Sequence, residues 1–273
     1  MNALKETKKK HLLAILKYLY LHNSSTMNEL VENLQLSQPS IRNMVRTLQE
    51  KQLIQEVGND LSSGGRCPTR FALNEKNYLI LCLYVQVDKV IYQLRNFNEI
   101  KKEGILFYQS EDELKKTIKD LIDQEKIHCC QIAVEGIVYE DVYVTDHHNV
   151  LEKHQWLKDI KKEINIPLQL QNDVKMIHQG CYFTYQQDST YYLYINEVGI
   201  GSSYFYKDEP LYGRSGIMGE IGLISLKGKT INQQIRECQN QEEFNEILSL
   251  LLSMVFTMID PKRLELSLDL KWR

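Results

Sequence analysis

The chain has 273 residues and a formal net charge of −3, with 43% hydrophobic and 25% charged residues. This balance is typical of a globular protein and excludes a wholly disordered chain, and the length allows one large domain or two smaller ones. No apolar run reaches the ~18 residues that span a bilayer, and the N-terminal lysines are not followed by a signal-peptide core. We therefore expect a cytoplasmic protein that makes no membrane contact.

The six cysteines include no C-x-x-C pair, which excludes a zinc ribbon and a thioredoxin-like motif. Cys129 and Cys130 are adjacent, so they form either a strained vicinal disulfide or two reduced thiols near a strand. Reduced thiols are the interpretation that a cytosolic protein favours.

The charge is unevenly distributed along the chain. Residues 1–74 hold 10 Lys and Arg against 6 Asp and Glu, whereas residues 75–273 hold 23 against 30. A basic head on an acidic body is the pattern expected when the head contacts nucleic acid.

The first 74 residues predict three helices followed by a β-hairpin. In chain order, we expect a helix over 6–22, a second from Thr26 to about Asn33, a third that begins at Ser37 and ends before Lys51, and strands over 53–57 and 69–73. Thr26 and Glu29 form a capping-box pattern at the second helix, and Ser37 is a favourable N-cap for the third. This order of elements is that of a winged helix-turn-helix.

The rest of the chain predicts an α/β body. We expect strands over 79–85, 89–95, 103–108, 129–134, 167–170, 191–195, 203–206 and 263–268, and helices over 111–126, 151–164, 173–185 and 241–259.

In a helix-turn-helix the second helix of the pair enters the major groove, and its N-terminal residues reach the base edges. The residues expected to contact DNA at the start of this helix are Ser37, Gln38, Ser40, Arg42, Asn43 and Arg46. Asn and Gln side chains pair with adenine edges, and Arg with guanine or phosphate. The loop residues Gly64, Gly65 and Arg66 predict a wing whose arginine enters the minor groove; alternatively, they form a simple hairpin turn with a solvated arginine.

Four segments of the head carry a family resemblance. They are Leu36-Ser-Gln-Pro-Ser-Ile-Arg-Asn-Met-Val-Arg-Thr-Leu48, Lys51-Gln-Leu-Ile54, Ser62-Ser-Gly-Gly-Arg-Cys-Pro68 and Leu73-Asn74. Together they resemble the winged-helix head of ROK repressors (repressor, open reading frame, kinase). The resemblance implies an α+β winged helix-turn-helix domain over 1–74 and an α/β actin-like (ribonuclease H-like) ROK domain over 75–273. Family repressors continue well beyond the unit at 260–268, so the ROK domain is expected to be shortened.

The body carries the resemblance more weakly. Asn172-Asp173 matches the asparagine–aspartate pair of the family, 194–201 its second glycine-rich phosphate loop, and 219–222 the segment before its zinc and sugar site. By this resemblance, Asn172, Asp173 and Glu220 hydrogen-bond sugar hydroxyls. The alternatives are a strand-end turn with a helix N-cap for Asn172-Asp173, and a solvated charge for Glu220. His147 and His148 fall where the family has a sugar-contacting loop.

Several family features needed for phosphoryl transfer are missing. The segment 81–88, which matches the first phosphate loop, contains no glycine, and Glu197 places a carboxylate in the second loop. Leu223 stands where the family has a zinc-binding histidine, and the cysteine cluster is absent. We therefore expect no catalytic activity, no metal and no other cofactor.

These features predict a sequence-specific DNA-binding transcription regulator, a repressor of carbohydrate-related genes. We expect it to bind a palindromic operator as a homodimer and to sense a sugar or sugar phosphate. One alternative is a ligand-independent DNA-binding protein whose body only dimerises. The other is a residual ROK sugar kinase, which the lost phosphate loop disfavours.

Overall fold

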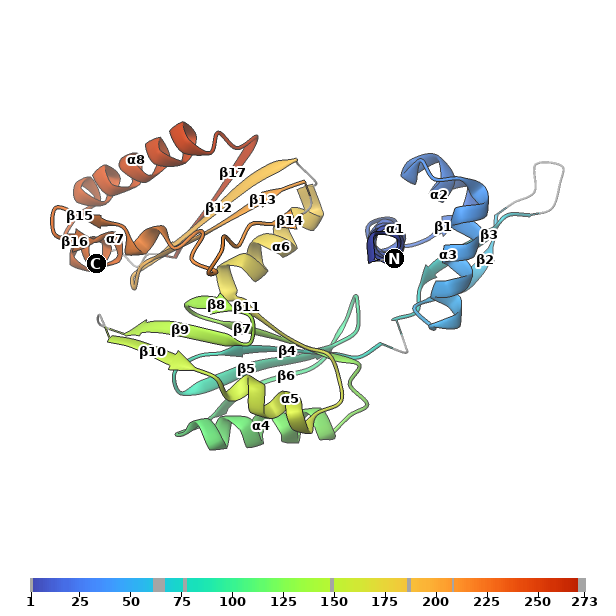
Figure 1. Ribbon diagram of the computed structural model, residues 1–273, viewed down its shortest axis with the longest axis horizontal. Helices are drawn as coiled ribbons and strands as arrows, with labels where there is room; N and C mark the ends of the chain where they lie inside the picture. Colours follow the sequence, from blue (N-terminus) through green and yellow to red (C-terminus); the bar gives the residue numbers. More distant parts are fainter. Residues whose placement is uncertain are drawn as a thin grey trace. The chain divides into compact units, whose positions relative to one another are not determined.

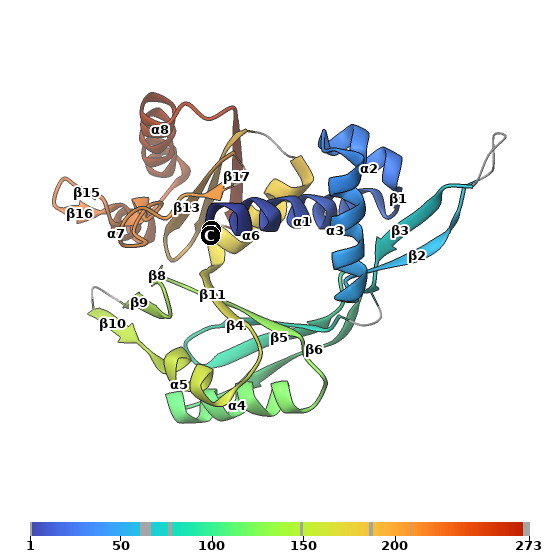
Figure 2. The same ribbon diagram turned by 45° about the vertical axis from the view of Figure 1, so that its right-hand side comes forward.

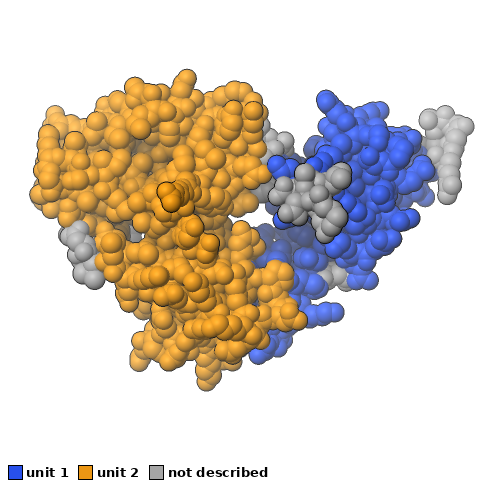
Figure 3. Space-filling view, viewed as in Figure 1, with its two compact units in different colours: residues 1–82, 92–104, 122–130 blue, residues 83–91, 105–121, 131–273 orange. Residues whose placement is uncertain are grey.

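The computed structural model describes residues 2–60, 67–75, 78–147, 150–185, 188–207 and 209–269. The chain forms two compact units, coloured separately in Figure 3. The first comprises residues 1–82, 92–104 and 122–130, and the second comprises residues 83–91, 105–121 and 131–273. The three predicted wing residues, Gly64, Gly65 and Arg66, lie outside the described residues.

The head contains the predicted helices and strands. Its elements are α1 (Asn2–His22), β1 (Ser25–Thr26), α2 (Met27–Leu34), α3 (Gln38–Glu50), β2 (Ile54–Asn59) and β3 (Thr69–Leu73). The three strands form an antiparallel sheet in the order β1-β3-β2. The short strand β1 was not predicted, because two residues carry no periodic pattern.

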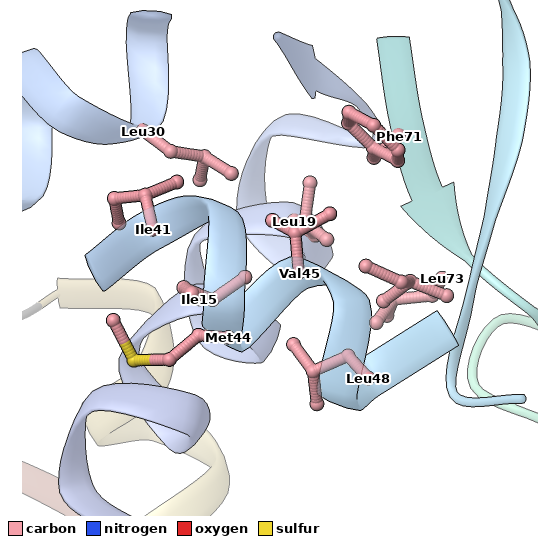
Figure 4. Packing of buried hydrophobic residues seen from close by; sticks show 10 residues of the cluster. Ile15, Leu19, Leu30, Ile41, Met44, Val45, Leu48, Phe71 and Leu73 are labelled. Carbon is pink, nitrogen blue, oxygen red and sulfur yellow. The ribbon is translucent and has the colours of Figure 1, made fainter. Parts of the chain in front are cut away.

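One hydrophobic cluster holds these elements together (Figure 4). Its buried members come from all three helices and both longer strands: Ile15, Leu19, Leu30, Ile41, Met44, Val45, Leu48, Ile54, Phe71 and Leu73. The spacing of Ile41, Val45 and Leu48 places these three side chains on one face of α3. The opposite face of α3 is thereby left to solvent.

The two helix starts differ in their capping. The Thr26 side chain accepts a hydrogen bond from the Glu29 N–H at 3.3 Å, and the Glu29 carboxylate accepts one from the Thr26 N–H at 2.8 Å. The predicted capping box is therefore confirmed. Ser37 occupies the N-cap position of α3, but its hydroxyl donates to the Ser40 hydroxyl at 2.9 Å and makes no capping hydrogen bond. The predicted N-cap position of Ser37 is confirmed, but the side-chain hydrogen bond that usually accompanies it is absent.

A five-stranded sheet has the order β11-β7-β4-β5-β6. Its strands are β4 (Ile80–Val85), β5 (Lys89–Arg95), β6 (Ile100–Phe107), β7 (Cys129–Val134) and β11 (Leu168–Asn172). Both ribbon views show α4 (Glu111–Asp123) and α5 (Trp156–Glu163) on the same face of this sheet (Figures 1 and 2).

The predicted helix over 151–164 is wrong in its first part. Residues 150–154 form β10 (Val150–His154), which pairs antiparallel with β9 (Val142–His147), and β9 in turn pairs with β8 (Ile137–Tyr139). Only α5, which begins at Trp156, is helical. The Leu151 side chain is exposed, so backbone pairing with β9, and not burial of an apolar face, determines the structure here.

A second sheet in the order β14-β13-β12-β17 has helices on both faces. It consists of β12 (Ser189–Asn196), β13 (Ile200–Tyr206), β14 (Glu209–Pro210) and β17 (Arg263–Asp269). Tyr191, Leu193 and Ile195 pack with residues of α7 (Ile231–Glu237) and α8 (Gln241–Met258). Figures 1 and 2 show α6 (Asp173–Tyr185) on the other face. The His178 ring nitrogen Nε2 of α6 lies 2.8 Å from the Thr190 hydroxyl of β12. This two-sided burial explains why β12 is apolar along most of its length.

Shorter elements connect β13 to α7: the 3₁₀ turn η2 (Ile221–Leu223) and the hairpin of β15 (Ser225–Leu226) and β16 (Lys229–Thr230). Cys129 and Cys130 are free thiols, so the vicinal disulfide is excluded. Among the described residues, none of the helices combines the length and hydropathy required to cross a bilayer.

Candidate functional site

The second unit contains a cavity of about 480 Å³. Its polar lining consists of Tyr84, Glu135, Thr145, Asp146, Asn172, Asp173, Tyr194, Asn196, Glu220, Asn232 and Arg236. Asn172, Asp173 and Glu220, the three residues predicted to contact a sugar, all line this cavity. The fold thus brings Glu220 to a pair of residues that lies about 48 positions earlier in the chain. Clustered polar groups in a concave, partly apolar site are a usual mark of a ligand-binding site.

Asn172 connects the strand end to the helix and to a neighbouring turn. Its Oδ1 accepts a hydrogen bond from the Lys175 N–H at 3.0 Å, as a helix N-cap does, and its Nδ2 donates to the Gly136 carbonyl at 2.9 Å. The helix N-cap interpretation of this residue is confirmed. A ligand contact by Asn172 remains a prediction.

Asp173 is the first residue of α6 and shares a hydroxyl with a second carboxylate. Its Oδ1 accepts from the Val174 N–H at 2.8 Å, and the Tyr84 hydroxyl lies 3.3 Å from its Oδ2 and 2.8 Å from Glu135 Oε1. Burial raises the pKa of Asp173 to about 6, and the nearby charge of Glu135 adds to this rise. At neutral pH Asp173 is mostly ionised, so it can accept hydrogen bonds from ligand hydroxyls.

Glu220 lies in the turn before η2 and is half-buried. Burial raises its pKa to about 7, although the Lys175 ammonium opposes this rise. Lys175 is itself buried, and its Nζ donates to the Gly216 carbonyl at 3.0 Å. Glu220 therefore does not fit the alternative interpretation of a solvated charge.

The loop between β12 and β13 uses its N–H groups within the protein. Asn196 Oδ1 accepts from the N–H groups of Val198 and Gly199, both at 3.0 Å, and Asn232 Oδ1 accepts from the Ile200 N–H at 2.8 Å. Phosphate loops bind their ligand through N–H groups of this kind. Here the side-chain amide oxygens of Asn196 and Asn232 accept these hydrogen bonds in place of a phosphate.

Asn232 is held between two glycines. A Cβ atom at Gly199 would lie 2.4 Å from Asn232 Oδ1, and one at Gly222 would lie 2.1 Å from the same atom. Only glycine at both positions leaves room for this side chain. Two glycines of the segments that resemble family motifs, 194–201 and 219–222, thus have a packing role.

Sequence reasoning missed Tyr84, Glu135, Asn232 and Arg236. Tyr84 lies near the end of β4 and Glu135 directly follows β7, and these two strands are neighbours in the sheet. Polar residues at the ends of adjacent strands are a signal that could have identified the first pair. No comparable signal marks Asn232 or Arg236, which α7 brings to the cavity.

Six of the predicted DNA-contacting residues lie at or just before α3 in the described part of the head. Gln38, Ser40, Arg42, Asn43 and Arg46 are all exposed on α3, and Ser37 is exposed directly before it. Arg46 Nε lies 3.3 Å from Glu50 one turn later, a solvent-exposed pair. The α3 part of the predicted surface is thus accessible, and contact with DNA remains a prediction.

Two further expectations concern metal and histidine ligands. Within the described ranges, no group of three or more His, Cys, Asp and Glu side chains is placed to hold a metal ion. Leu223, at the position of the family's zinc-binding histidine, lines the cavity. His148 lies outside the described residues, and the side chain of His147 is likewise not described.

Comparison with known proteins gives a consistent set of relatives. The xylose repressor of Staphylococcus xylosus is 24% identical over 229 residues, which cover 76% of this chain and 58% of the repressor. Among solved structures, a ROK family transcriptional regulator that is a homologue of the E. coli MLC protein matches with a TM-score of 0.63. It is 16% identical, and the match covers 86% of this chain and 66% of the regulator.

A ROK family protein from Streptococcus pneumoniae, in complex with sucrose, matches with a TM-score of 0.56 at 14% identity, over 70% of this chain and 80% of that protein. These likenesses show that the body has the actin-like fold of ROK proteins. The chain spans less than two thirds of the length of the first two relatives. Residues 104–249, more than half of the chain, match the sequence profile of the ROK family. The chain therefore belongs to the ROK family.

Proposed function

We propose that the protein is a sugar-responsive, DNA-binding transcription regulator, with residues 1–74 as a winged helix-turn-helix domain and 75–273 as a ROK-type body. The observation that carries this proposal is the two-faced helix α3. Ile41, Val45 and Leu48 anchor it in the head core, while Arg42 and Asn43 are exposed. A helix that is fixed on one face and polar on the other can enter the major groove without loss of core packing.

The comparisons support a regulator with a head of this kind. The likeness to the ROK transcriptional regulator covers 86% of the chain, which is more than residues 75–273 alone provide. A second relative, the xylose repressor, is by its name a repressor. We infer repression of carbohydrate-related genes as the direction of control.

The loop chemistry argues against a sugar kinase. The N–H groups of Val198, Gly199 and Ile200 are already hydrogen-bonded to amide oxygens, so a nucleotide phosphate would have to displace them. Each displaced bond removes about 1 kcal/mol, and the side chains of 81–88, where no glycine is present, hinder close approach of a phosphate to the backbone. We propose that the body binds a ligand without chemical conversion and uses no metal or other cofactor.

The effector site of this proposal is the 480 Å³ cavity. Asp173 and Glu220 supply carboxylates that accept sugar hydroxyls, with Asn172 at the same wall. The names of two relatives, a xylose repressor and a ROK protein in complex with sucrose, support a sugar as the ligand class. Occupancy regulates DNA binding only if the ligand favours one arrangement of two heads in a homodimer over another.

Fluorescence anisotropy of a labelled fragment of the upstream DNA, at two salt concentrations, tests this function. We expect saturable binding that exceeds binding to random DNA, weakens with salt and is lost when the effector sugar is added. The double variant Arg42→Ala with Arg66→Ala should bind at least about 10-fold more weakly. Arg214→Ala, which removes an exposed arginine of the second unit, is the matched control and should bind normally.

The same titration separates the alternatives. Specific binding that no sugar changes would favour a ligand-independent DNA-binding protein whose body only dimerises. Sugar-dependent ATP hydrolysis that disappears in Asp173→Ala would instead establish the residual kinase. Wild-type operator affinity in the double arginine variant would show that the α3 and wing residues are not the DNA-binding surface.

A further inference from the structure

We propose that the cavity selects an uncharged sugar and rejects the phosphate ester of the same sugar. The proposal rests on the proposed function, because it assigns the effector to the same cavity, and it narrows the ligand to unphosphorylated polyols. The residues that set this selectivity are Glu135 and Asp146, together with the carboxylates of Asp173 and Glu220.

The charge of the lining is the first argument. Four carboxylates line the cavity, whereas Arg236 is the one cationic side chain among the described lining residues. A phosphate monoester carries a charge of about −1.5 to −2 at pH 7. Such a group would be repelled by a lining of this sign, most strongly where water is excluded.

Two cations lie at or near the cavity, and each makes a hydrogen bond within the protein. Arg236 Nη1 donates to the Val198 carbonyl at 3.0 Å, and its guanidinium keeps further N–H donors. The Lys175 ammonium is buried and donates to the Gly216 carbonyl at 3.0 Å. One guanidinium does not balance four carboxylates, so the described lining keeps a net negative charge.

The backbone donors are engaged as well. The loop N–H groups at Val198, Gly199 and Ile200 donate to Asn196 and Asn232, so these donors are used within the protein, and the charged acceptors of the lining are carboxylate oxygens. Oxygen acceptors suit ligand hydroxyls, which donate hydrogen bonds, and they repel phosphate oxygens, which only accept them.

An uncharged sugar fits the remaining features. Asp173 and Glu135 flank one tyrosine hydroxyl and provide charged acceptors for sugar hydroxyls. The apolar lining, which includes Val144, Leu151 and Leu223, provides a surface for the C–H face of a sugar ring. Sugar sites combine polar edges and apolar faces in this way.

Isothermal titration of the full chain without DNA, at pH 7.5, tests the selectivity. The probes are matched pairs: glucose, fructose and N-acetylglucosamine, each against its 6-phosphate. We expect at least one free sugar to bind and its phosphate to bind at least about 100-fold more weakly. Equal or tighter binding of a phosphate would overturn the proposal, as would the absence of binding by every member of the panel.

The variant Glu135→Gln tests the cause. Glutamine keeps an acceptor for the Tyr84 hydroxyl but removes one charge, so the ratio of free-sugar affinity to sugar-phosphate affinity should fall about 10-fold. Glu242→Gln, at an exposed position of α8 away from the cavity lining, is the control and should change neither. An unchanged ratio in Glu135→Gln would contradict the charge argument.

These measurements contain no DNA and are therefore independent of the regulator test. If DNA binding fails while the sugar is still preferred over its phosphate, only the proposed function is overturned. If DNA binding succeeds and a sugar phosphate binds best, only the selectivity is overturned.

Discussion

The carboxyl group of Asp173 connects the cavity to the pH dependence of stability. Its pKa rises from 3.8 to about 6 on folding, chiefly through burial. Because the folded state holds this proton more tightly than the unfolded chain does, ionisation of Asp173 lowers stability as pH rises from about 4 to about 6. Above that window the destabilisation is complete and no longer changes.

Asp173→Asn removes this ionisation and should stabilise the protein more at pH 7.5 than at pH 4.5. We expect the gain in free energy of unfolding to be larger at pH 7.5 by about 1–2 kcal/mol, after allowance for partial solvent exposure. Urea unfolding of wild type and variant at both pH values measures it. Glu197→Gln, an exposed carboxylate of the same unit, is the control. A gain that is the same at both pH values would contradict burial as the cause.

Individual site residues could be predicted only where they belong to a family motif. Asn172, Asp173 and Glu220 followed from the family resemblance, and the cavity brings them together. Tyr84 and Asn232 were missed because each acts through a partner distant in the chain. Tyr84 meets Asp173 89 positions away, and Asn232 meets Ile200 32 positions away. Such contacts arise from strand order and helix packing, which local patterns do not encode.

At the scale of elements, α2 and α3 begin with different kinds of cap. Thr26 makes reciprocal capping-box bonds, and Arg70 from β3 donates to the Ser24 hydroxyl at 3.1 Å and pairs with Glu29 at 3.2 Å. Ser37 makes no capping bond to α3. The two helix starts therefore depend on their hydroxyl residues to different degrees.

Thr26→Ala should lower the free energy of unfolding by about 1 kcal/mol, whereas Ser37→Ala should lower it by less than about 0.5 kcal/mol. The difference arises because only the first substitution leaves the Glu29 N–H without its acceptor. Thermal or urea unfolding in the absence of DNA measures both. Thr26→Ser keeps the hydroxyl and should recover most of the loss. Equal effects of the two alanine variants would contradict the capping assignment.

Helices and strands could be predicted where apolar residues recur regularly over a long segment. They could not be predicted where the conformation depends on pairing with another strand. The helix of α8 and the strands β5 and β7 followed from apolar spacing within a few residues of their bounds. The residues 150–154 did not, because their conformation depends on β9, with Leu151 opposite Asp146 and His154 opposite Tyr143. Tertiary pairing here overrides a local pattern that also fits a helix.

For the whole molecule, the distribution of charge determines how it can approach DNA. The chain carries a net charge of −3, yet its first 74 residues hold 10 basic against 6 acidic residues. In the proposed function a body of the opposite sign adds repulsion, so the few basic residues of the head that contact DNA supply the attraction to phosphate. Binding should therefore depend steeply on each of them.

Replacing Arg42 and Arg46 together by alanine should make the salt dependence of DNA binding shallower. We expect the slope of log affinity against log salt to fall in magnitude by about 1–2, since each lost phosphate contact removes about 0.9 from it. Random and specific DNA should be affected alike by any lost phosphate contact, whereas Asn43→Ala should reduce only the preference for the specific sequence. Anisotropy titrations from low to physiological salt measure the slope for the wild type, the double variant and Asn43→Ala. Arg214→Ala, in the second unit, is the control. If Arg214→Ala changes the slope as much as the double variant, the body and not α3 provides the electrostatic contact.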